Sequence, residues 1–284
     1  MGLVSISELL TRAEAGGYAV GAFNCNNMEI VQAIMEAAEA ERSPVILQAS
    51  QGAIKYAGIN YIVALAREAA AGTRVPVALH LDHGTDFAQV MLCIRHGFTS
   101  VMIDGSRYPL LENIALTRRV VEVAQAVGVS VEGELGRITG TEDEISVAER
   151  EAFFTDPEEA RIFVRETGVN ALAVAIGTAH GRYKGKPELD FPRLAKIREL
   201  TGVPLVLHGS SGVPDEDIKR AIALGVRKIN IDTNIREAFV AGMRQVLEEN
   251  PGEIDPRKIL GPARAAAREV IREKIRLFGC AGKA

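Results

Sequence analysis

The sequence predicts an α/β fold, a single (β/α)8 TIM barrel that spans residues 1–284. Eight short apolar or β-branched runs alternate along the chain with segments of helical periodicity, at spacings of roughly 20–40 residues. The runs are almost continuously apolar, which is typical of parallel strands buried on both faces. The length of 284 residues is also close to the roughly 250 residues of a typical barrel of this kind.

Each predicted element follows from a local pattern. The strands are the eight apolar runs, at 18–24, 44–50, 76–82, 100–106, 129–135, 171–177, 204–210 and 227–233. Helices are expected between them, because apolar residues recur there at helical spacing, as at Ile30, Ile34, Val90, Ile94, Ile218 and Ile222. The motif DPEEA (156–160) predicts a helix start, with Asp as the cap and Pro in the first turn. An extra amphipathic helical extension is expected from about residue 254.

One connection is much longer than the others. Residues 136–155 separate the fifth strand from its helix and contain the acidic cluster Glu142, Asp143 and Glu144. Structureless loops of this length in compact domains are usually either functional or disordered. The segment is therefore interpreted either as an active-site loop or as a solvated excursion of the surface.

Composition narrows the function classes. The formal net charge is −4, which gives no reason to expect a nucleic acid or an anionic membrane surface as a partner. No uncharged apolar stretch approaches 18 residues. The three cysteines form no CxxC pair, and the first residues lack the pattern of a signal peptide. A cytoplasmic protein is the resulting expectation.

Three of the five histidines end predicted strands: His83, His180 and His208. In a closed parallel barrel these ends meet at one rim, where active sites lie. Imidazole is the commonest metal ligand, and three protein ligands with an open fourth position are typical of a catalytic zinc site. One such histidine alone would more often be a hydrogen-bonded structural residue. Three in the same setting predict a zinc site, although such ligands also accept cobalt or iron.

Carboxylates accompany these histidines. Asp82 directly precedes His83, where it could act as a general acid/base, a ligand or a residue that orients a ligand. Glu132 and Glu134 are two residues apart and share one face of a strand. Because buried carboxylates need partners, this pair indicates a nearby metal or basic group, or else a buried salt bridge.

The last two strands are followed by motifs suited to phosphate. HGSSG (208–212) follows the seventh strand and NIDTN (230–234) ends the eighth. In barrels, the loops after these two strands frequently bind phosphate through backbone N–H groups and a helix N-terminus. The alternative is that both are ordinary strand-to-helix turns.

Taken together, these motifs resemble those of class II, metal-dependent fructose-bisphosphate aldolases, in the short-chain branch that also contains tagatose-bisphosphate aldolase. The matching blocks run in order along nearly the whole chain: AFN, LHLDHG, MIDGS, VEGELG with a TEDE loop, AIGTAHGRYKG, LVLHGSSGVP, KINIDTN and DPRK. Any one of these blocks would be a weak signal, whereas the ordered set is specific.

The resemblance implies catalytic roles for particular residues. His83, His180 and His208 would hold the catalytic zinc, and Asp82 would move the proton of the hydroxyl next to the bond that breaks. Glu134 and Asp104 match positions that bind a second or alternative divalent metal. Glu142 matches the acid that moves the proton at the carbon next to the carbonyl, with Asp143 and Glu144 as neighbouring alternatives.

The resemblance also implies how substrates bind. The substrate-binding positions would be Asn24, Ser50, Gly181, Lys184, Gly209, Ser210, Ser211, Asn230, Asp232 and Thr233. Carbonyls near Ala179, Gly181 and Gly209 match a monovalent-cation site for Na⁺ or K⁺. Arg257 matches an arginine that binds the second phosphate in a neighbouring subunit, which implies a homodimer or homotetramer.

The implied activity is the reversible cleavage of fructose 1,6-bisphosphate, a ketose bisphosphate, into two triose phosphates, a reaction of glycolysis and gluconeogenesis. The sequence itself favours a metal over a Schiff-base lysine, because Lys228 alone lies within a predicted strand, and it is expected near the end far from the active site. Three alternatives remain: a tagatose-bisphosphate aldolase, a metal-bearing barrel that binds sugar phosphates without cleaving them, and a hydrolase that uses zinc-bound water.

Overall fold

Eight parallel strands form a closed barrel in the computed structural model, which describes residues 2–142, 145–147, 154–183, 185 and 187–284. The order around the barrel is β1, β11, β10, β8, β5, β4, β3 and β2. The strands are β1 (Val20–Asn24), β2 (Val45–Ser50), β3 (Val77–Gly84), β4 (Ser100–Ile103), β5 (Ser130–Leu135), β8 (Ala171–Val174), β10 (Leu205–Leu207) and β11 (Val226–Ile231). The predicted (β/α)8 fold is confirmed.

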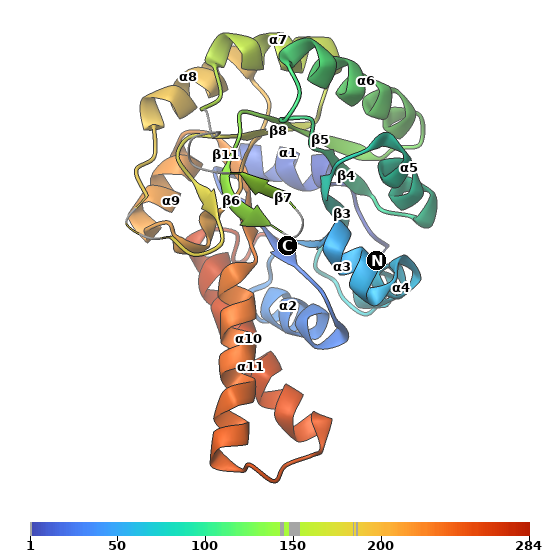
Figure 1. Cartoon of the computed structure of the whole chain (residues 1–284), viewed down its shortest axis with the longest axis vertical. Coiled ribbons are helices and arrows are strands. Elements are labelled where there is room, and N and C mark those ends of the chain that lie inside the picture. Colours follow the sequence, from blue (N-terminus) through green and yellow to red (C-terminus); the bar gives the residue numbers. More distant parts are fainter. Residues whose placement is uncertain (1, 143–144, 148–153, 184, 186) are drawn as a thin grey trace.

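Helices surround the barrel on the outside (Figure 1). They are α2 (Met28–Glu41), α3 (Gln51–Ala57), α4 (Ile59–Ala71), α5 (Phe87–His96), α6 (Leu110–Ala126), α7 (Pro157–Thr167), α8 (Phe191–Thr201), α9 (Asp215–Ala223), α10 (Thr233–Glu249) and α11 (Pro256–Leu277). Most begin at a residue whose side chain accepts a backbone N–H, such as Asn27, Asp86 or Asp156. Their apolar faces and the buried strands together form one continuous core.

Helix α1 (Ile6–Gly16) closes the end of the barrel where the strands begin. Ser7 and Ser130, at the start of β5, share a hydrogen bond of 2.9 Å between their hydroxyls. Leu9 and Leu10 are fully buried beneath the strands. Because this end is sealed, any site in the barrel must open at the opposite rim.

Several strands end earlier than the sequence predicted. β4, β8 and β10 stop at Ile103, Val174 and Leu207, three residues short of the apolar runs. The residues that follow leave the barrel sheet and build loops at the rim. Part of the rim is therefore made from residues whose backbone is not held in the pairing of the barrel strands.

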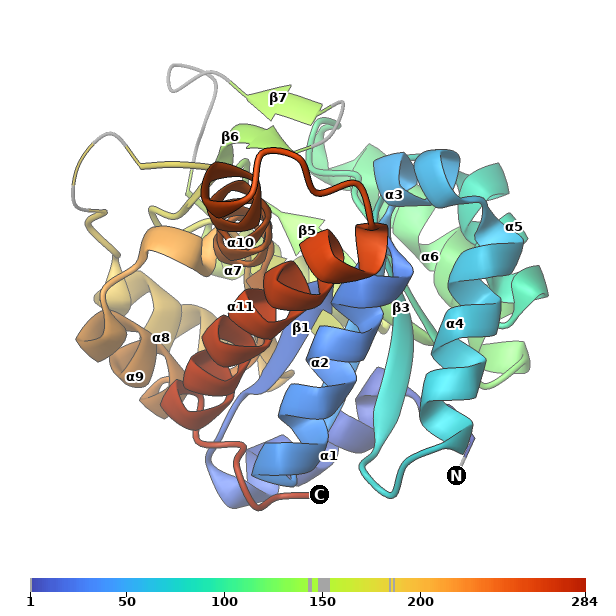
Figure 2. The same cartoon turned by 90° about the horizontal axis from the view of Figure 1, so that it is seen from below.

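The long connection after β5 carries a small sheet of its own. β6 (Thr139–Glu142) pairs antiparallel with β7 (Ile145–Val147) and parallel with β9 (Ala179–His180). Gly140 is the register partner of His180, which places β6 directly beside a predicted metal ligand. Figure 2 shows this sheet at the end of the molecule opposite the two chain termini.

Helices α10 and α11 extend well beyond the ring of helices (Figure 1). They pack closely because Gly242 lacks a side chain: a Cβ there would lie 2.8 Å from the Cα of Ala263. Residues 250–255 join the two helices at the far tip, where Ile254 is 91% exposed. Within the described residues, no helix is both long and apolar enough to cross a membrane.

Replacing Leu10 with alanine should lower the free energy of unfolding by about 2–5 kcal/mol, because a fully buried leucine side chain leaves a cavity. Urea denaturation measures this change. The matched control is Leu111→Ala on α6, whose leucine is 78% exposed and should change stability by less than about 0.5 kcal/mol. Equal effects for the two variants would contradict the sealing role of α1.

Candidate active site

The predicted metal ligands meet at the open rim. The imidazole centroids of His83 and His208 are 4.7 Å apart, those of His83 and His180 are 5.2 Å apart, and those of His180 and His208 are 6.0 Å apart. One ligand atom from each ring lies within 4.8 Å of the other two. Three strand ends that are distant in sequence thus converge on one point.

His83 reaches this point through an unusual backbone conformation. Its φ of +48° lies in the left-handed region, which side-chain-bearing residues seldom adopt. The Gln51 side chain donates to the His83 carbonyl at 2.6 Å and to the Thr85 hydroxyl at 2.9 Å. This bend interrupts the alternation of side chains along β3, so the side chains of the neighbours Asp82 and His83 can both face the rim.

Buried carboxylates determine which nitrogen of two imidazoles carries the proton. Nε2 of His208 lies 2.8 Å from Glu132, and Nδ1 of His83 lies 3.2 Å from Asp104. A carboxylate oxygen accepts the N–H, which leaves the other ring nitrogen with its lone pair. Those remaining nitrogens, Nδ1 of His208 and Nε2 of His83, face each other at 2.9 Å.

The donor set fits a zinc ion. Two lone pairs facing each other at 2.9 Å repel unless a cation or proton lies between them. Burial lowers the pKa of His208, partly opposed by Glu132, and so favours the neutral ring that a metal requires. His83, His180 and His208 would hold the ion, with carboxylates behind two of them.

A second group of ligands adjoins the first. His83, Asp104 and Glu134 also offer ligand atoms within 4.8 Å of one another. Burial opposes ionisation of Asp104, but His83 and Ser106 more than offset it and hold its pKa at about 2. The residues predicted to bind a second divalent metal therefore lie together.

Amides hold Asp82 in place. Among the described residues, the side chains of Asn24, Gln48 and Asn230 donate to its carboxylate at 2.9, 3.2 and 3.1 Å. Gln48 also donates to Oδ1 of the Asn24 side chain at 2.6 Å. The carboxylate is fully buried, so these contacts determine its orientation beside the three imidazoles.

A charged network lies below the imidazoles inside the barrel. Glu132 and Lys228 are fully buried and form an ion pair of 3.0 Å. Nε2 of His80 lies 3.4 Å from Glu132, and its Nδ1 lies 2.7 Å from the Ser100 hydroxyl. Burial opposes ionisation of Glu132, but Lys228 and His208 outweigh it and hold its pKa well below the usual range.

Lys228 lies in the first half of β11, as expected, but its side chain reaches toward the active site. Its Nζ lies 2.7 Å from Oδ1 of the Asn230 side chain, and the amide nitrogen of the same side chain donates to Asp82. The lysine side chain is long enough to run up the barrel interior from the middle of β11. Its amine is engaged by Glu132 and Asn230, so it is not placed as a free nucleophile.

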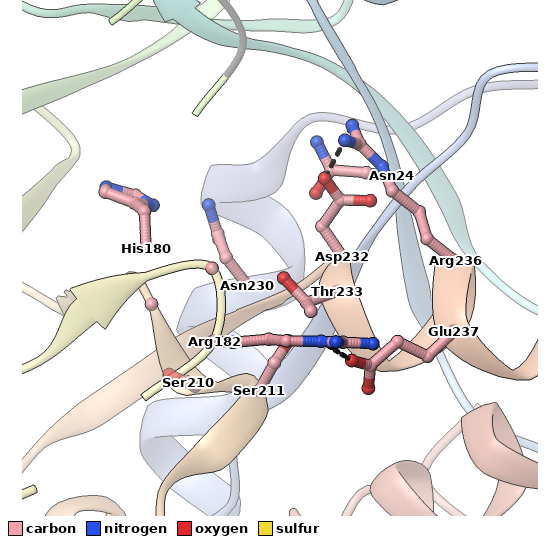
Figure 3. A pocket seen from close by; sticks show the side chains of 12 residues that line it. Asn24, His180, Arg182, Ser210, Ser211, Asn230, Asp232, Thr233, Arg236 and Glu237 are labelled. Carbon is pink, nitrogen blue, oxygen red and sulfur yellow. Dashed lines mark hydrogen bonds and ion pairs between the residues drawn. The ribbon is translucent and has the colours of Figure 1, made fainter. Parts of the chain in front are cut away.

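Beside the imidazoles lies a pocket of about 220 Å³ (Figure 3). Its lining includes the predicted metal ligand His180 and, from β1, β11 and the loops after β9, β10 and β11, the predicted substrate-binding residues Asn24, Gly181, Gly209, Ser210, Ser211, Asn230, Asp232 and Thr233. Thr233 begins the 17-residue helix α10, whose N-terminal amides and dipole favour an anion. The pocket therefore suits phosphate.

Two arginines at this pocket were not predicted. Figure 3 shows Arg182 paired with Glu237, and Arg236 paired with Asp232 at 2.7 Å. Both pairs lie at the side of the pocket toward α10. Each arginine is neutralised by its acidic partner, so the two pairs add donors but no net charge beside the helix N-terminus.

Tyr183 joins the two loops of the pocket. Its hydroxyl donates to the Gly209 carbonyl at 2.7 Å and accepts the Ala179 N–H at 2.8 Å. Burial raises its pKa to about 12, so the phenol keeps its proton and can donate. Gly209 has a φ of +63°, and a Cβ there would lie 2.5 Å from the Ala179 carbonyl oxygen. The backbone of the predicted cation site is thus closely packed.

Other predicted residues lie apart from this pocket or outside the described residues. Ser50 is the register partner of Asp82, but its hydroxyl caps α3. Arg257 is at the start of α11, 89% exposed and paired with Asp255. Glu142 ends β6, and its side chain lies outside the described residues, as do Asp143, Glu144 and Lys184.

Sequence reasoning missed the roles of Gln48 and Lys228. Both had a signal, because each is a polar residue inside an otherwise apolar strand run. A polar side chain buried in a barrel needs polar partners there, and the rim residues are the nearest. Tyr183 had no comparable signal, because its role depends on loop geometry.

Comparisons with known proteins agree with this geometry. Residues 4–283 match the family model described as fructose-bisphosphate aldolase class-II. The chain is 53% identical to a fructose-bisphosphate aldolase of Thermus caldophilus, covering 99% of this chain and 100% of that protein. It is 49% identical to one of Geobacillus stearothermophilus, covering 100% and 99%. The crystal structure of the YdjI aldolase from Escherichia coli K12 superposes with a TM-score of 0.87 at 35% identity, covering 99% of both chains. The chain belongs to the class II fructose-bisphosphate aldolase family and is a carbon–carbon lyase.

Proposed function

We propose that this protein catalyses the reversible cleavage of fructose 1,6-bisphosphate into dihydroxyacetone phosphate and glyceraldehyde 3-phosphate. The observation that carries the proposal is the position of Asp82, beside three convergent imidazoles and next to a phosphate-sized pocket. An acid/base group, a metal site and an anion site thus share one rim. The names of the two curated relatives favour fructose over tagatose bisphosphate.

The chemistry needs stabilisation of the charge that develops on the three-carbon fragment. A zinc ion held by His83, His180 and His208 supplies this as a Lewis acid, worth several kcal/mol. Asp82 accepts the proton of the hydroxyl next to the breaking bond during cleavage and returns it during condensation. Asn24, Gln48 and Asn230 orient the carboxylate for this transfer.

Glu142 is proposed to move the proton at the carbon next to the carbonyl. Strand β6, which ends at Glu142, is anchored beside His180 through the pairing of Gly140 with His180. This anchoring brings the backbone of Glu142 close to the rim. Asp143 and Glu144 remain the neighbouring alternatives for the same role.

The triose phosphate end of the substrate is proposed to bind in the pocket at the α10 N-terminus. Gly181, Gly209, Ser211 and Thr233 line it with backbone amides and hydroxyls. Ser210, whose hydroxyl donates to the Leu207 carbonyl, shapes the loop. Lys184 is proposed to add charge, and the carbonyls of Ala179, Gly181 and Gly209 to bind Na⁺ or K⁺.

Arg257 is proposed to serve a neighbouring subunit in a homodimer or homotetramer. It lies on the extension formed by α10 and α11, away from the pocket of its own chain.

Glu134 and Asp104 are proposed to bind a second divalent metal with His83.

A cytoplasmic location is proposed because Cys25, Cys93 and Cys280 are buried free thiols.

Asp82→Ala should lower kcat by about 10³-fold or more, because proton transfer loses its acid/base group. Bound zinc, measured by elemental analysis, should remain, since Asp82 is not in the imidazole cluster. Asp215→Ala, on the exposed start of α9, is the control and should keep wild-type turnover. A near wild-type rate for Asp82→Ala would overturn the mechanism.

Purified protein should cleave fructose 1,6-bisphosphate faster than tagatose 1,6-bisphosphate. The assay follows release of triose phosphates with and without a chelator, and zinc should restore the chelated enzyme. Faster cleavage of tagatose bisphosphate would establish the other sugar as substrate. Release of inorganic phosphate without a three-carbon product would instead indicate the hydrolase.

Tyr183→Phe should raise the KM for the bisphosphate about 5- to 30-fold, the equivalent of about 1–2 kcal/mol. The change removes the bridge between the Ala179 and Gly209 backbones, while kcat should change little. Steady-state kinetics measures both constants. Tyr61→Phe, at a tyrosine that is 73% exposed, is the control, and an unchanged KM in Tyr183→Phe would refute the bridging role.

A further inference from the structure

We propose that Lys228 is a positioning residue for the lyase reaction, which orients both the zinc-binding imidazole of His208 and the carboxylate of Asp82. The proposal rests on the proposed function. Lys228 does not line the pocket, because its side chain lies fully buried inside the barrel. Among the described residues its amine makes two polar contacts, each of which leads to a different part of the site.

The first contact leads to the metal ligands. Nζ of Lys228 lies 3.0 Å from Oε2 of Glu132, while Oε1 of the same carboxylate lies 2.8 Å from Nε2 of His208. A carboxylate held at one oxygen by an ammonium presents the other in a defined direction. That direction holds the His208 ring so that Nδ1 faces His83. Partners of this kind, behind a ligand, typically change metal affinity or activity 10- to 100-fold.

The second contact leads to Asp82. Nζ of Lys228 donates to Oδ1 of the Asn230 side chain at 2.7 Å, and Nδ2 of the same side chain donates to Oδ1 of Asp82 at 3.1 Å. An ammonium has only donors, so it can face only the oxygen of the amide. The NH2 group must then point toward Asp82. Without Lys228 the amide could turn over, and its oxygen would repel the carboxylate.

These two contacts make a prediction that simple stabilisation of the core does not. Glu132→Gln by itself alters the contact with His208, so this single variant is the baseline for the test. A lysine that only neutralised Glu132 could then be removed at no further cost to catalysis. A lysine that orients the Asn230 amide could not, so comparing Glu132→Gln/Lys228→Met with Glu132→Gln separates the two roles.

The experiment compares Lys228→Met, Glu132→Gln, Glu132→Gln/Lys228→Met and Arg227→Met in the zinc-loaded protein. Arg227 is the matched control, because it neighbours Lys228 on β11 but pairs with Glu14 instead. Steady-state kinetics gives kcat and KM, chelator competition gives the zinc Kd, and circular dichroism confirms folding. Both Lys228 variants should lower kcat about 100-fold with KM within about threefold, and raise the zinc Kd about tenfold. The kcat of the double variant should lie about tenfold below that of Glu132→Gln, and Arg227→Met should change none of the three constants.

The outcomes distinguish the proposals. A folded double variant whose kcat is no lower than that of Glu132→Gln would refute the positioning role, as would a raised KM with unchanged kcat in Lys228→Met. Inactivation of the wild type by borohydride with dihydroxyacetone phosphate, lost in Lys228→Met, would show instead that Lys228 forms a Schiff base. A wild type that binds zinc but cleaves neither bisphosphate would refute the proposed function itself. The zinc Kd of the variants would then still test the contact through Glu132.

Discussion

The ion pair between Glu132 and Lys228 is the interaction on which the site depends. A carboxylate that is completely removed from water is tolerated only when its charge is compensated. Lys228 compensates the charge of Glu132 at 3.0 Å, and His208 lies within hydrogen-bond distance of its other oxygen at 2.8 Å. Removing Lys228 would leave the charge of Glu132 buried without its cation. The centre of this barrel is thus polar, whereas the layer between its strands and the surrounding helices is apolar.

This polar centre supports the rim above it. Glu132 holds the proton of His208 on Nε2, as Asp104 holds that of His83 on Nδ1. The lone pairs of both rings are therefore directed toward the point that His180 also approaches. Asp82 is held next to them by amides that cannot themselves take up its proton. The geometry of the proposed metal site and acid/base group would thus be set before substrate arrives.

The proposed anion binding relies on a different set of groups. The pocket beside His180 is built from glycines, hydroxyl groups and the first turn of α10. Its described arginines, Arg182 and Arg236, are each paired with an acid. Backbone amides at a helix N-terminus are therefore the main fixed source of positive potential on the described side of the pocket. Because Gly209 packs directly on Ala179, the loops on either side of the pocket are held close together.

The sequence by itself determined the barrel, its open rim and the identity of most rim residues. Strand runs and their polar ends are local patterns, and closure of a parallel barrel brings such ends together in any protein of this fold. His83, His180, His208 and Asp82 could be found for this reason. Gln48 was also within reach, as a polar residue inside an apolar strand.

Only the tertiary structure decided how these residues act on one another. It set the proton positions on His83 and His208, the orientation of the Asn230 amide and the reach of Lys228 up the barrel interior. It also placed Arg257 far from its own pocket and gave the long connection a hairpin beside His180. These features depend on side-chain conformations and contacts between distant segments, which no local pattern of residues encodes.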